Sequence, residues 1–322
     1  MHGRRRGTGV RYRLIMDMDD ASSNMAAPPP PDENLFLGPQ GLRPGWRVLV
    51  FALLFIVFDV ILIGGAVLLG LPVRVRGHEL SPLLMAVPEG STFLAALGAA
   101  GVMSVGERRA MGAYGLPLAQ AFRGQFWRGA LWGFAALTAL LAALRATGSF
   151  DFGAVALHGS ALVQAAASWA AVFVLVGFAE EYLVRGYALV TLARGVGFWP
   201  AAIILSIIFG GMHLGNTGEN ALGALSAGLI GLFFCFTVRR TGHLWFAVGF
   251  HFLWDYSETF LYSVPDSGMV PRHTLLSSSF HGSHWLTGGS VGPEGSLLVF
   301  PLIAILFWLF ARFQPEVKFS AA

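Results

Sequence analysis

Long apolar runs dominate this chain and limit what it can fold into. The run VLVFALLFIVF, residues 48–58, is apolar on every face, and about 20 such residues form a helix that crosses a bilayer core about 30 Å thick. A transmembrane barrel would instead need alternating segments of about 10 residues. The sequence therefore predicts an all-α, polytopic bundle of about eight transmembrane helices, at about residues 47–71, 83–104, 126–145, 162–194, 198–214, 221–238, 243–263 and 295–312.

The composition agrees with a membrane protein. Hydrophobic residues make up 55% of the 322 residues and charged residues only 12%, whereas soluble domains carry about a quarter charged residues. The single cysteine, Cys235, excludes a disulfide framework and a thiolate metal site. Nothing indicates nucleic-acid binding. The predicted helix at 162–194 is too long for a simple crossing, so it must tilt, kink or protrude.

The membrane part has tails on both sides. Residues 1–44 contain RRRGTGVRYR and PPPPDE without apolar periodicity, which predicts a disordered N-terminal tail. The membrane domain is expected at residues 45–314, with its motif core at about 160–262, and residues 315–322 form a short C-terminal tail. Sixteen basic residues fall on the side of the N-terminus and four on the other, with Arg185 set aside. This bias predicts both termini in the cytoplasm, and the Ala- and Gly-rich composition suggests a bacterial cytoplasmic membrane.

The motif EEYLVR places three charges inside a predicted span. Ionisable groups at bilayer depth are costly unless they are paired or wet, so they indicate function by default. Arg185 lies about 40° around the helix from Glu181 but about 140° from Glu180. Arg185 is therefore expected to pair with Glu181 and to leave Glu180 free. The structural alternative is a buried network of all three residues that locks helices together.

Two further motifs place histidines one helical turn from a partner. In FGGMH, Phe209 and His213 share a helical face, and in HFLWD so do His251 and Asp255. His213 and Glu180 are equally far from the turn GVGFWP, so an antiparallel hairpin brings them to the same depth. For each histidine, the alternative is a hydrogen-bonded packing residue.

Two other polar features stay without assigned chemistry. Asp59, in the first span, is expected to pair with another polar group or to sit in a wet cavity. His273, His281 and His284 lie in a Gly-rich outer segment. A flexible loop or lid with incidental histidines is the favoured interpretation of that segment.

The motif residues together predict hydrolysis by one of two routes. Glu180, His213 and His251 can bind a divalent metal such as zinc, or they can hold and deprotonate a water directly. Glu180 is then the general base, and the histidines position the water and stabilise the oxyanion. The sequence contains no HExxH, and its GxSxG match, GGSVG at residues 288–292, lies in the Gly-rich outer segment and not at a strand-to-helix turn, so no serine elbow of the usual kind is indicated.

The three motifs, in this order, resemble EExxxR, FxxxH and HxxxN/D of the CPBP family, the CAAX-protease and bacteriocin-processing intramembrane proteases. The resemblance covers about residues 90–312. It implies an eight-helix fold in which Glu180 activates water and His213 is its partner. It also implies that the cavity opens to the cytosol, as in the prenyl-protein proteases, although the residue count places His213 far from the cytoplasmic turn.

The resemblance assigns the other motif residues as well. His251 and Asp255 would form the oxyanion or metal-binding side, and Glu181, Arg185 and Phe209 would support the site. Asp255 stands where the prenyl-protein proteases carry asparagine. Because an ionised aspartate repels an oxyanion, Asp255 must be protonated, orient His251 or help to bind a cation.

The expected function is an intramembrane endopeptidase that cleaves a membrane-associated peptide or protein within the lipid bilayer. Two alternatives remain open at this point. A proton-coupled transporter would use Glu180, Asp255 and Asp59 as a proton path. A noncatalytic immunity or scaffold protein would use the motifs for helix packing only.

Overall fold

The computed structural model describes residues 34–39, 41–73 and 79–319. The chain divides into two units, Met1–Leu42 and Arg43–Ala322. In the first unit, β1 (Leu37–Gly38) and β2 (Gly41–Leu42) pair as a small antiparallel hairpin, so this part of the predicted tail has local structure. The disorder predicted for residues 1–33 lies outside the described residues, as does the end of the C-terminal tail at 320–322.

The second unit is a helical bundle, as predicted. Its α-helices are α1 (Pro44–Leu68), α2 (Pro82–Glu107), α3 (Gly124–Ala146), α4 (Gly159–Tyr182), α5 (Leu189–Val196), α6 (Phe198–His213), α7 (Ala221–Thr241), α8 (Trp245–Tyr256), α9 (His284–Thr287) and α10 (Val299–Phe313). Two π-helical segments, η3 (Leu183–Ala188) and η4 (Ser257–Leu261), continue α4 and α8, and the 3-10 turns are η1 (Met111–Tyr114), η2 (Leu118–Gln120) and η5 (Pro293–Gly295).

Fewer helices are long enough to cross a membrane than the eight spans that the sequence predicted. Each of the eight predicted segments coincides with helical structure. Within the described ranges, however, five helices are long and apolar enough to cross a membrane, namely α1, α2, α3, α7 and the continuous rod Gly159–Val196. The apolar helices α6 and α10 are shorter. The fold class is confirmed, whereas the count of eight spans stays a prediction.

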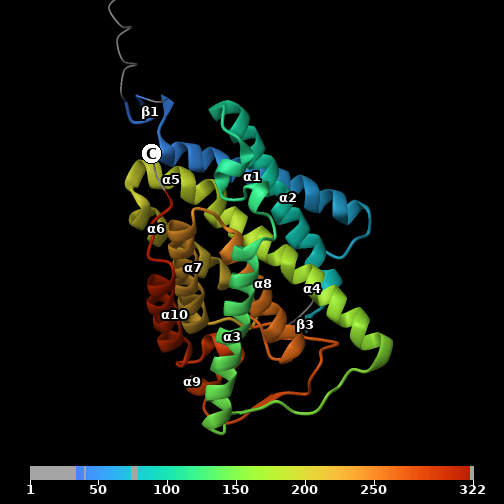
Figure 1. The fold of residues 1–322 in the computed structure, drawn as a ribbon. Helices are drawn as coiled ribbons and strands as arrows, with labels where there is room; N and C mark the ends of the chain where they lie inside the picture. Colours follow the sequence, from blue (N-terminus) through green and yellow to red (C-terminus); the bar gives the residue numbers. More distant parts are fainter. Residues whose placement is uncertain (1–33, 40, 74–78, 320–322) are drawn as a thin grey trace, which may run out of the picture. The chain divides into compact units, whose positions relative to one another are not determined.

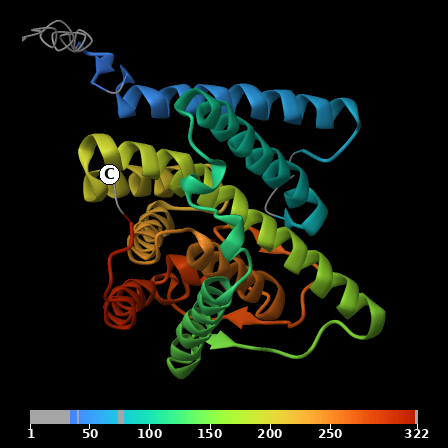
Figure 2. The same cartoon turned by 45° about the horizontal axis from the view of Figure 1, so that its top comes forward.

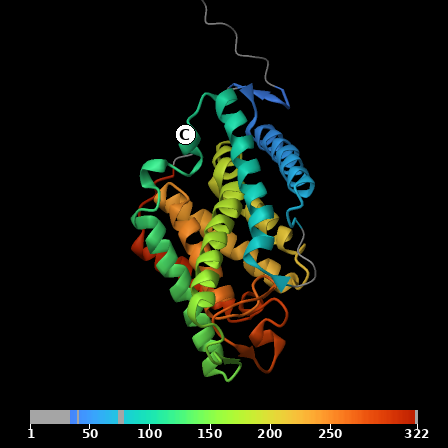
Figure 3. The ribbon, with the colours of Figure 1, turned by 90° about the vertical axis from the view of Figure 1, so that its right-hand side faces the viewer.

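The rod formed by α4, η3 and α5 organises the bundle. Figures 1 and 2 show it running through the middle of this unit, with α1 and α2 on one side and α3, α7, α8 and α10 on the other. The view in Figure 3 shows α1 and α2 side by side. The rod bends at Gly186, whose ψ of −110° is not helical. The kink expected in this long segment is therefore present, and it lies within the EEYLVRG motif.

Small residues bring the helices of the site close together. A Cβ atom at Gly129, Gly133 or Gly249 would overlap the main chain of the facing helix, so α3 and α8 are in direct backbone contact. At Gly177 of α4, a Cβ would lie 3.1 Å from the Val248 carbonyl oxygen of α8. Small residues at such crossings allow membrane helices to approach closely. They place the motif-bearing faces of α4 and α8 against each other.

One end of this unit gathers the start of α1, the turn between α5 and α6, and the C-terminal segment. A Cβ at Gly195 would meet the ring of Pro44, and the rings of Phe198 and Phe319 are 5.3 Å apart. The amides of Lys318 and Phe319 donate to the Arg239 carbonyl at the end of α7. Both ends of the helical unit therefore meet on one side of it.

The opposite end is built from the long segment between α8 and α10, residues 263–298. Its strand β5 (Val270–Pro271) pairs in parallel with β3 (Glu79–Leu80), and β6 (Ser279–Phe280) pairs antiparallel with β4 (Phe150–Asp151). The ion pair between Arg272 and Glu79 reinforces the first of these pairings. This segment is therefore tied to the bundle by two strand pairings and an ion pair, whereas its predicted flexibility stays a prediction.

Candidate active site

A cavity of about 350 Å³ collects most of the predicted site residues. Its walls come from α2, α4, α6, α7, α8 and α10, together with Leu80, the loop that follows α6 and the 263–298 segment. Five predicted residues line it, namely Glu180, Phe209, His213, His251 and Asp255. Three motifs that are far apart in the sequence are thus brought to one cavity by three separate helices.

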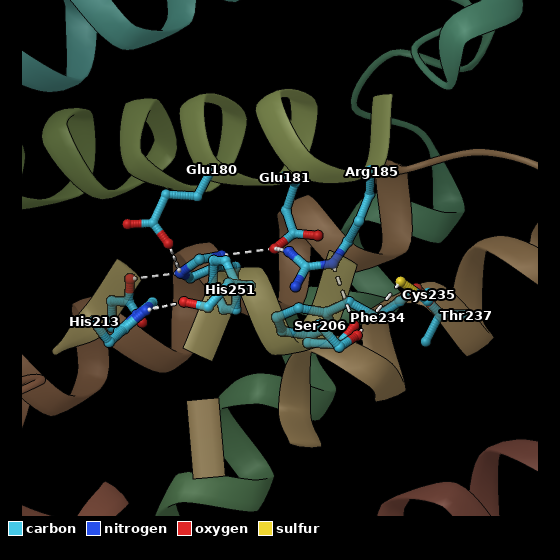
Figure 4. A network of polar contacts seen from close by, with 12 residues as sticks. Glu180, Glu181, Arg185, Ser206, His213, Phe234, Cys235, Thr237 and His251 are labelled. Atoms are coloured by element: carbon cyan, nitrogen blue, oxygen red, sulfur yellow. Dashed lines mark hydrogen bonds and ion pairs between the residues drawn. The ribbon is translucent and has the colours of Figure 1, made fainter. Parts of the chain in front are cut away.

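Glu181 and Arg185 lie behind this cavity as a buried ion pair. Both side chains are 0% exposed, and Arg185 Nη1 donates to Glu181 Oε1 at 2.7 Å (Figure 4). The guanidinium also donates through Nε to the Gly231 carbonyl at 3.2 Å and lies 4.2 Å from the centre of the Phe209 ring. The pairing expected from the helical angle is present, and the aromatic ring stabilises the buried cation further.

His251 is held between the two glutamates. Its Nδ1 lies 3.1 Å from Glu181 Oε1, and its Nε2 lies 3.7 Å from Glu180 Oε2 and 3.3 Å from Asp255 Oδ2. Figure 4 shows the Glu180 carboxylate turned toward the His251 ring. Because Glu181 is ion-paired and only accepts hydrogen bonds, the Nδ1 of His251 donates to it. The Nε2 side therefore faces the cavity.

The acceptors around His251 Nε2 require a shared proton or a cation. Two carboxylates, Glu180 and Asp255, point at one nitrogen. Glu180 Oε2 has no hydrogen-bond partner within the described chain. Carboxylates without a proton only accept hydrogen bonds, so this convergence is satisfied only when a proton or another positive group lies between them. The arrangement can hold and transfer a proton.

His213 has its own fixed orientation. Its Nδ1 lies 2.9 Å from the Phe209 carbonyl oxygen, and the two rings are 4.6 Å apart in a T-shaped contact. Since a carbonyl oxygen only accepts, Nδ1 carries the proton and Nε2 keeps its lone pair. Among the described residues, no direct hydrogen bond or ion pair joins His213 to Glu180. His213 therefore lines the same cavity without touching the glutamate.

The predicted metal ligands do not form a compact ligand set. In the described part of the chain, one group of three His, Cys, Asp or Glu residues has ligand atoms that all lie within 4.8 Å of one another, and it consists of Glu258, Asp266 and Glu294. Glu180, His213 and His251 are not such a group. We therefore derive no chemical step through a metal at these three residues.

The structure adds cavity residues that the sequence analysis did not select. Glu89 of α2 lines the cavity, as do Trp254, Asp266 and Glu294. Glu89 follows Pro88 within an apolar helix. An ionisable residue inside a predicted membrane span indicates a functional role, and this rule could have identified Glu89 as a site residue. Asp266 and Glu294 come from the 263–298 segment. Helical periodicity does not relate residues of this largely nonhelical segment to the motifs on the helices, so the sequence could not place them at the site.

The two features without assigned chemistry lie away from the cavity. Asp59 Oδ1 accepts a 2.6 Å hydrogen bond from Ser91, so it joins α1 to α2 as a polar pair. In the 263–298 segment, His281 lies 3.2 Å from Asp151 and is largely exposed. Neither His273, His281 nor His284 lines the cavity. These residues have packing and surface roles in the described structure.

Apolar spanning helices and a buried polar cavity define an integral membrane protein with an intramembrane site. The comparison with protein families identifies it further. Residues 162–257, which contain all three motifs, match the family described as "Rce1-like: Type II CAAX prenyl endopeptidase Rce1-like". The match supports the CAAX protease family for the part of the chain that carries the three motifs. No curated protein and no solved structure matched the chain.

Proposed function

We propose that this protein hydrolyses a peptide bond of a membrane-associated peptide or protein, with Glu180 as the general base. One observation carries the proposal: Glu180 Oε2 lies in the cavity, 3.7 Å from His251 Nε2 and without a hydrogen-bond partner in the described chain. A carboxylate in that position can take a proton from a water molecule bound between it and the histidines. The lone pair on Nε2 of His213 would orient the same water.

The remaining steps use the same residues. The hydroxide formed by proton transfer to Glu180 attacks the carbonyl carbon of the scissile bond. The resulting oxyanion is stabilised by the Nε2–H of His251, which Glu181 and Asp255 hold in position. Glu180 then gives its proton to the leaving amine as the carbon–nitrogen bond breaks. Because Asp255 Oδ2 lies 3.3 Å from that same Nε2, its carboxyl would be protonated at this step, so that it leaves the Nε2–H free and does not repel the oxyanion.

The test is cleavage of a fluorogenic peptide panel by the purified protein in detergent. Glu180→Gln and His213→Ala should abolish cleavage while expression and folding persist. The loss at Glu180 should be about 100-fold or greater, the usual contribution of a general base. Full activity in either variant would refute the assignment. Loss of cleavage after chelation, restored by zinc, would instead assign metal assistance.

We also propose that the cavity opens on the extracytoplasmic side. Gly215, Asn216 and Thr217 line it, and they follow the end of α6 that lies opposite the α5–α6 turn. That turn is at the end where the start of α1 and the C-terminal segment meet. Because the basic residues predict a cytoplasmic location for that end, the cavity would face outward. The substrate bond would then be cleaved near the outer leaflet.

Cysteine labelling tests this orientation. Cys235 is buried, and replacing it by alanine provides a background without native thiols. In intact cells, a membrane-impermeant maleimide should label Thr217→Cys, which lies on an exposed loop, but not Val196→Cys, which is 48% exposed at the opposite end. Labelling of Val196→Cys alone would place the cavity on the cytoplasmic side.

A further inference from the structure

Three carboxylates meet at a second place, beside the cavity wall. Glu258 comes from η4, Asp266 from the loop that follows it, and Glu294 from η5. Each offers an oxygen atom that lies within 4.8 Å of those of the other two. In the part of the chain that the structure describes, no ion pair joins any of them to lysine, arginine or histidine. Their negative charges are therefore not balanced by a basic side chain there.

Glu258 supplies an observation that is separate from this clustering. Its side chain is 0% exposed, and neither carboxylate oxygen has a direct hydrogen-bond partner among the described residues, although the indole of Trp254, which donates to Glu294, also lies near it. Buried carboxylates are normally hydrogen-bonded, paired or bound to a metal. A fully buried carboxylate that points at two others is satisfied either by a proton shared with them or by a positively charged ligand between them.

The other two carboxylates are held in place by donors. Thr259 donates to Asp266 Oδ2 at 2.8 Å, and Ser267 donates to Glu294 Oε2 at 2.7 Å. The indole Nε1 of Trp254 donates to Glu294 Oε1 at 3.1 Å. These hydrogen bonds fix the directions of Asp266 and Glu294 without neutralising them, so the three carboxylates are oriented in advance for a ligand.

We propose that Glu258, Asp266 and Glu294 bind a divalent cation of the calcium class. All the ligand atoms are oxygens, which favour hard cations over zinc. Two oxygens on opposite sides of a calcium ion are about 4.6–5.2 Å apart, because Ca–O distances are about 2.3–2.6 Å. Magnesium requires a tighter octahedron, with opposite oxygens about 4.2 Å apart. The oxygens of the three carboxylates lie within 4.8 Å of one another, which both ions can satisfy, but magnesium is usually held by one or two carboxylates whereas calcium takes six to eight oxygen ligands, so a group of three carboxylates favours calcium.

A cation can reach this site through the cavity, and once bound it would link two segments of the chain. Asp266 and Glu294 line the cavity that also contains Glu180 and His251, so an ion can enter through it. Bound there, it would tie the 263–298 segment to η4, which continues the helix that carries His251. The bound cation would thus hold this helix in position. Cation binding at the three carboxylates does not depend on whether the protein is a protease.

The experiment measures ion binding, with terbium as a luminescent probe for a calcium site. The full chain, purified in detergent and stripped with a chelator, is titrated with Tb³⁺ and excited at the tryptophan band. Because the Trp254 indole donates directly to Glu294, it should sensitise one bound Tb³⁺, and calcium should displace that ion. Trp254→Phe should lower the sensitised emission while calcium still raises the thermal midpoint of unfolding.

Variants decide whether these carboxylates are the ligands. Glu258→Gln should weaken calcium binding about tenfold or more, because the number of charged ligands sets the affinity of such sites. It should also remove the calcium-dependent rise in the unfolding midpoint. The control, Glu316→Gln, changes an exposed acidic residue that pairs with Lys318 outside the group, and it should leave binding unchanged. If Glu258→Gln does not fold, Glu294→Gln provides the same comparison.

Two outcomes would overturn the proposal. One is wild-type protein that binds no calcium and shows no calcium-dependent stability. The other is a Glu258→Gln protein that binds calcium as tightly as the wild type. Glu180→Gln should lose cleavage and keep calcium binding, so failure of the cation site and failure of the proposed protease mechanism are told apart by separate measurements.

Discussion

Replacing Glu181 by glutamine should separate the stability of this site from its chemistry. The substitution keeps the shape of the side chain but removes the charge that balances Arg185. Both side chains are 0% exposed, so the guanidinium would be left buried with the Gly231 carbonyl and the Phe209 ring as partners. Breaking a buried ion pair from one side costs about 3–5 kcal/mol. We expect Glu181→Gln to lose about that much free energy of unfolding.

Glu180→Gln is the matched control. Its side chain is 26% exposed, and its near neighbour is His251 rather than a permanent cation. The expected stability change is therefore within about 1 kcal/mol. Glu181→Gln should also impair cleavage, because Glu181 accepts from Nδ1 of His251 and so sets which nitrogen faces the cavity.

Both variants can be measured by reversible unfolding in mixed micelles and by peptide cleavage. The expected pattern is that both lose activity while only Glu181→Gln loses several kcal/mol. Equal stability of the two variants would refute the division into a supporting and a reacting glutamate. A double variant, Glu181→Gln with Arg185→Met, should recover much of the stability because no unpaired buried charge remains.

Three further outcomes are expected. Gly231→Ala should cost about 1–3 kcal/mol, since its Cβ would lie 2.5 Å from Arg185 Nη2, whereas Gly101→Ala has open space and should be neutral in thermal unfolding. Burial raises the pKa of Glu219 from 4.5 to about 7, so its contribution to stability falls as the pH rises between these values, and Glu219→Gln should flatten that slope. Asp59→Asn should keep peptide cleavage, because Asp59 lies outside the cavity lining; a large loss of cleavage in a stably folded variant would contradict this placement.

Much of the site was predictable because charged side chains inside an apolar helix cost free energy unless they are paired or solvated. Arg185, Glu181 and Glu180 had to be explained in an apolar helix, and helical geometry correctly separated the paired glutamate from the free one. The one-turn spacing in FGGMH was also informative, since Phe209 and His213 are in contact. The roles of these residues in catalysis stay predictions.

Other contacts required the structure. Asp255, Glu258 and Tyr262 follow one another at a 3–4 spacing, yet their side chains have different surroundings. Asp255 lines the cavity, Glu258 faces Asp266 and Glu294, and the Tyr262 hydroxyl bonds to Thr138 of α3. The π-helical segment η4 is the cause, because its wider turn rotates the residues that follow. A count at 3.6 residues per turn cannot anticipate that change.

The sequence by itself determined that this is a helical membrane protein and which ionisable residues needed a functional explanation. Both conclusions follow from local rules, since the length of an apolar run and the cost of a buried charge do not depend on the fold. Only the tertiary structure decided which carboxylates meet. Glu89, Asp266 and Glu294 reach the cavity through helix crossings and through the pairing of the 263–298 segment with distant strands. Such contacts join residues far apart in the chain, and no local spacing records them.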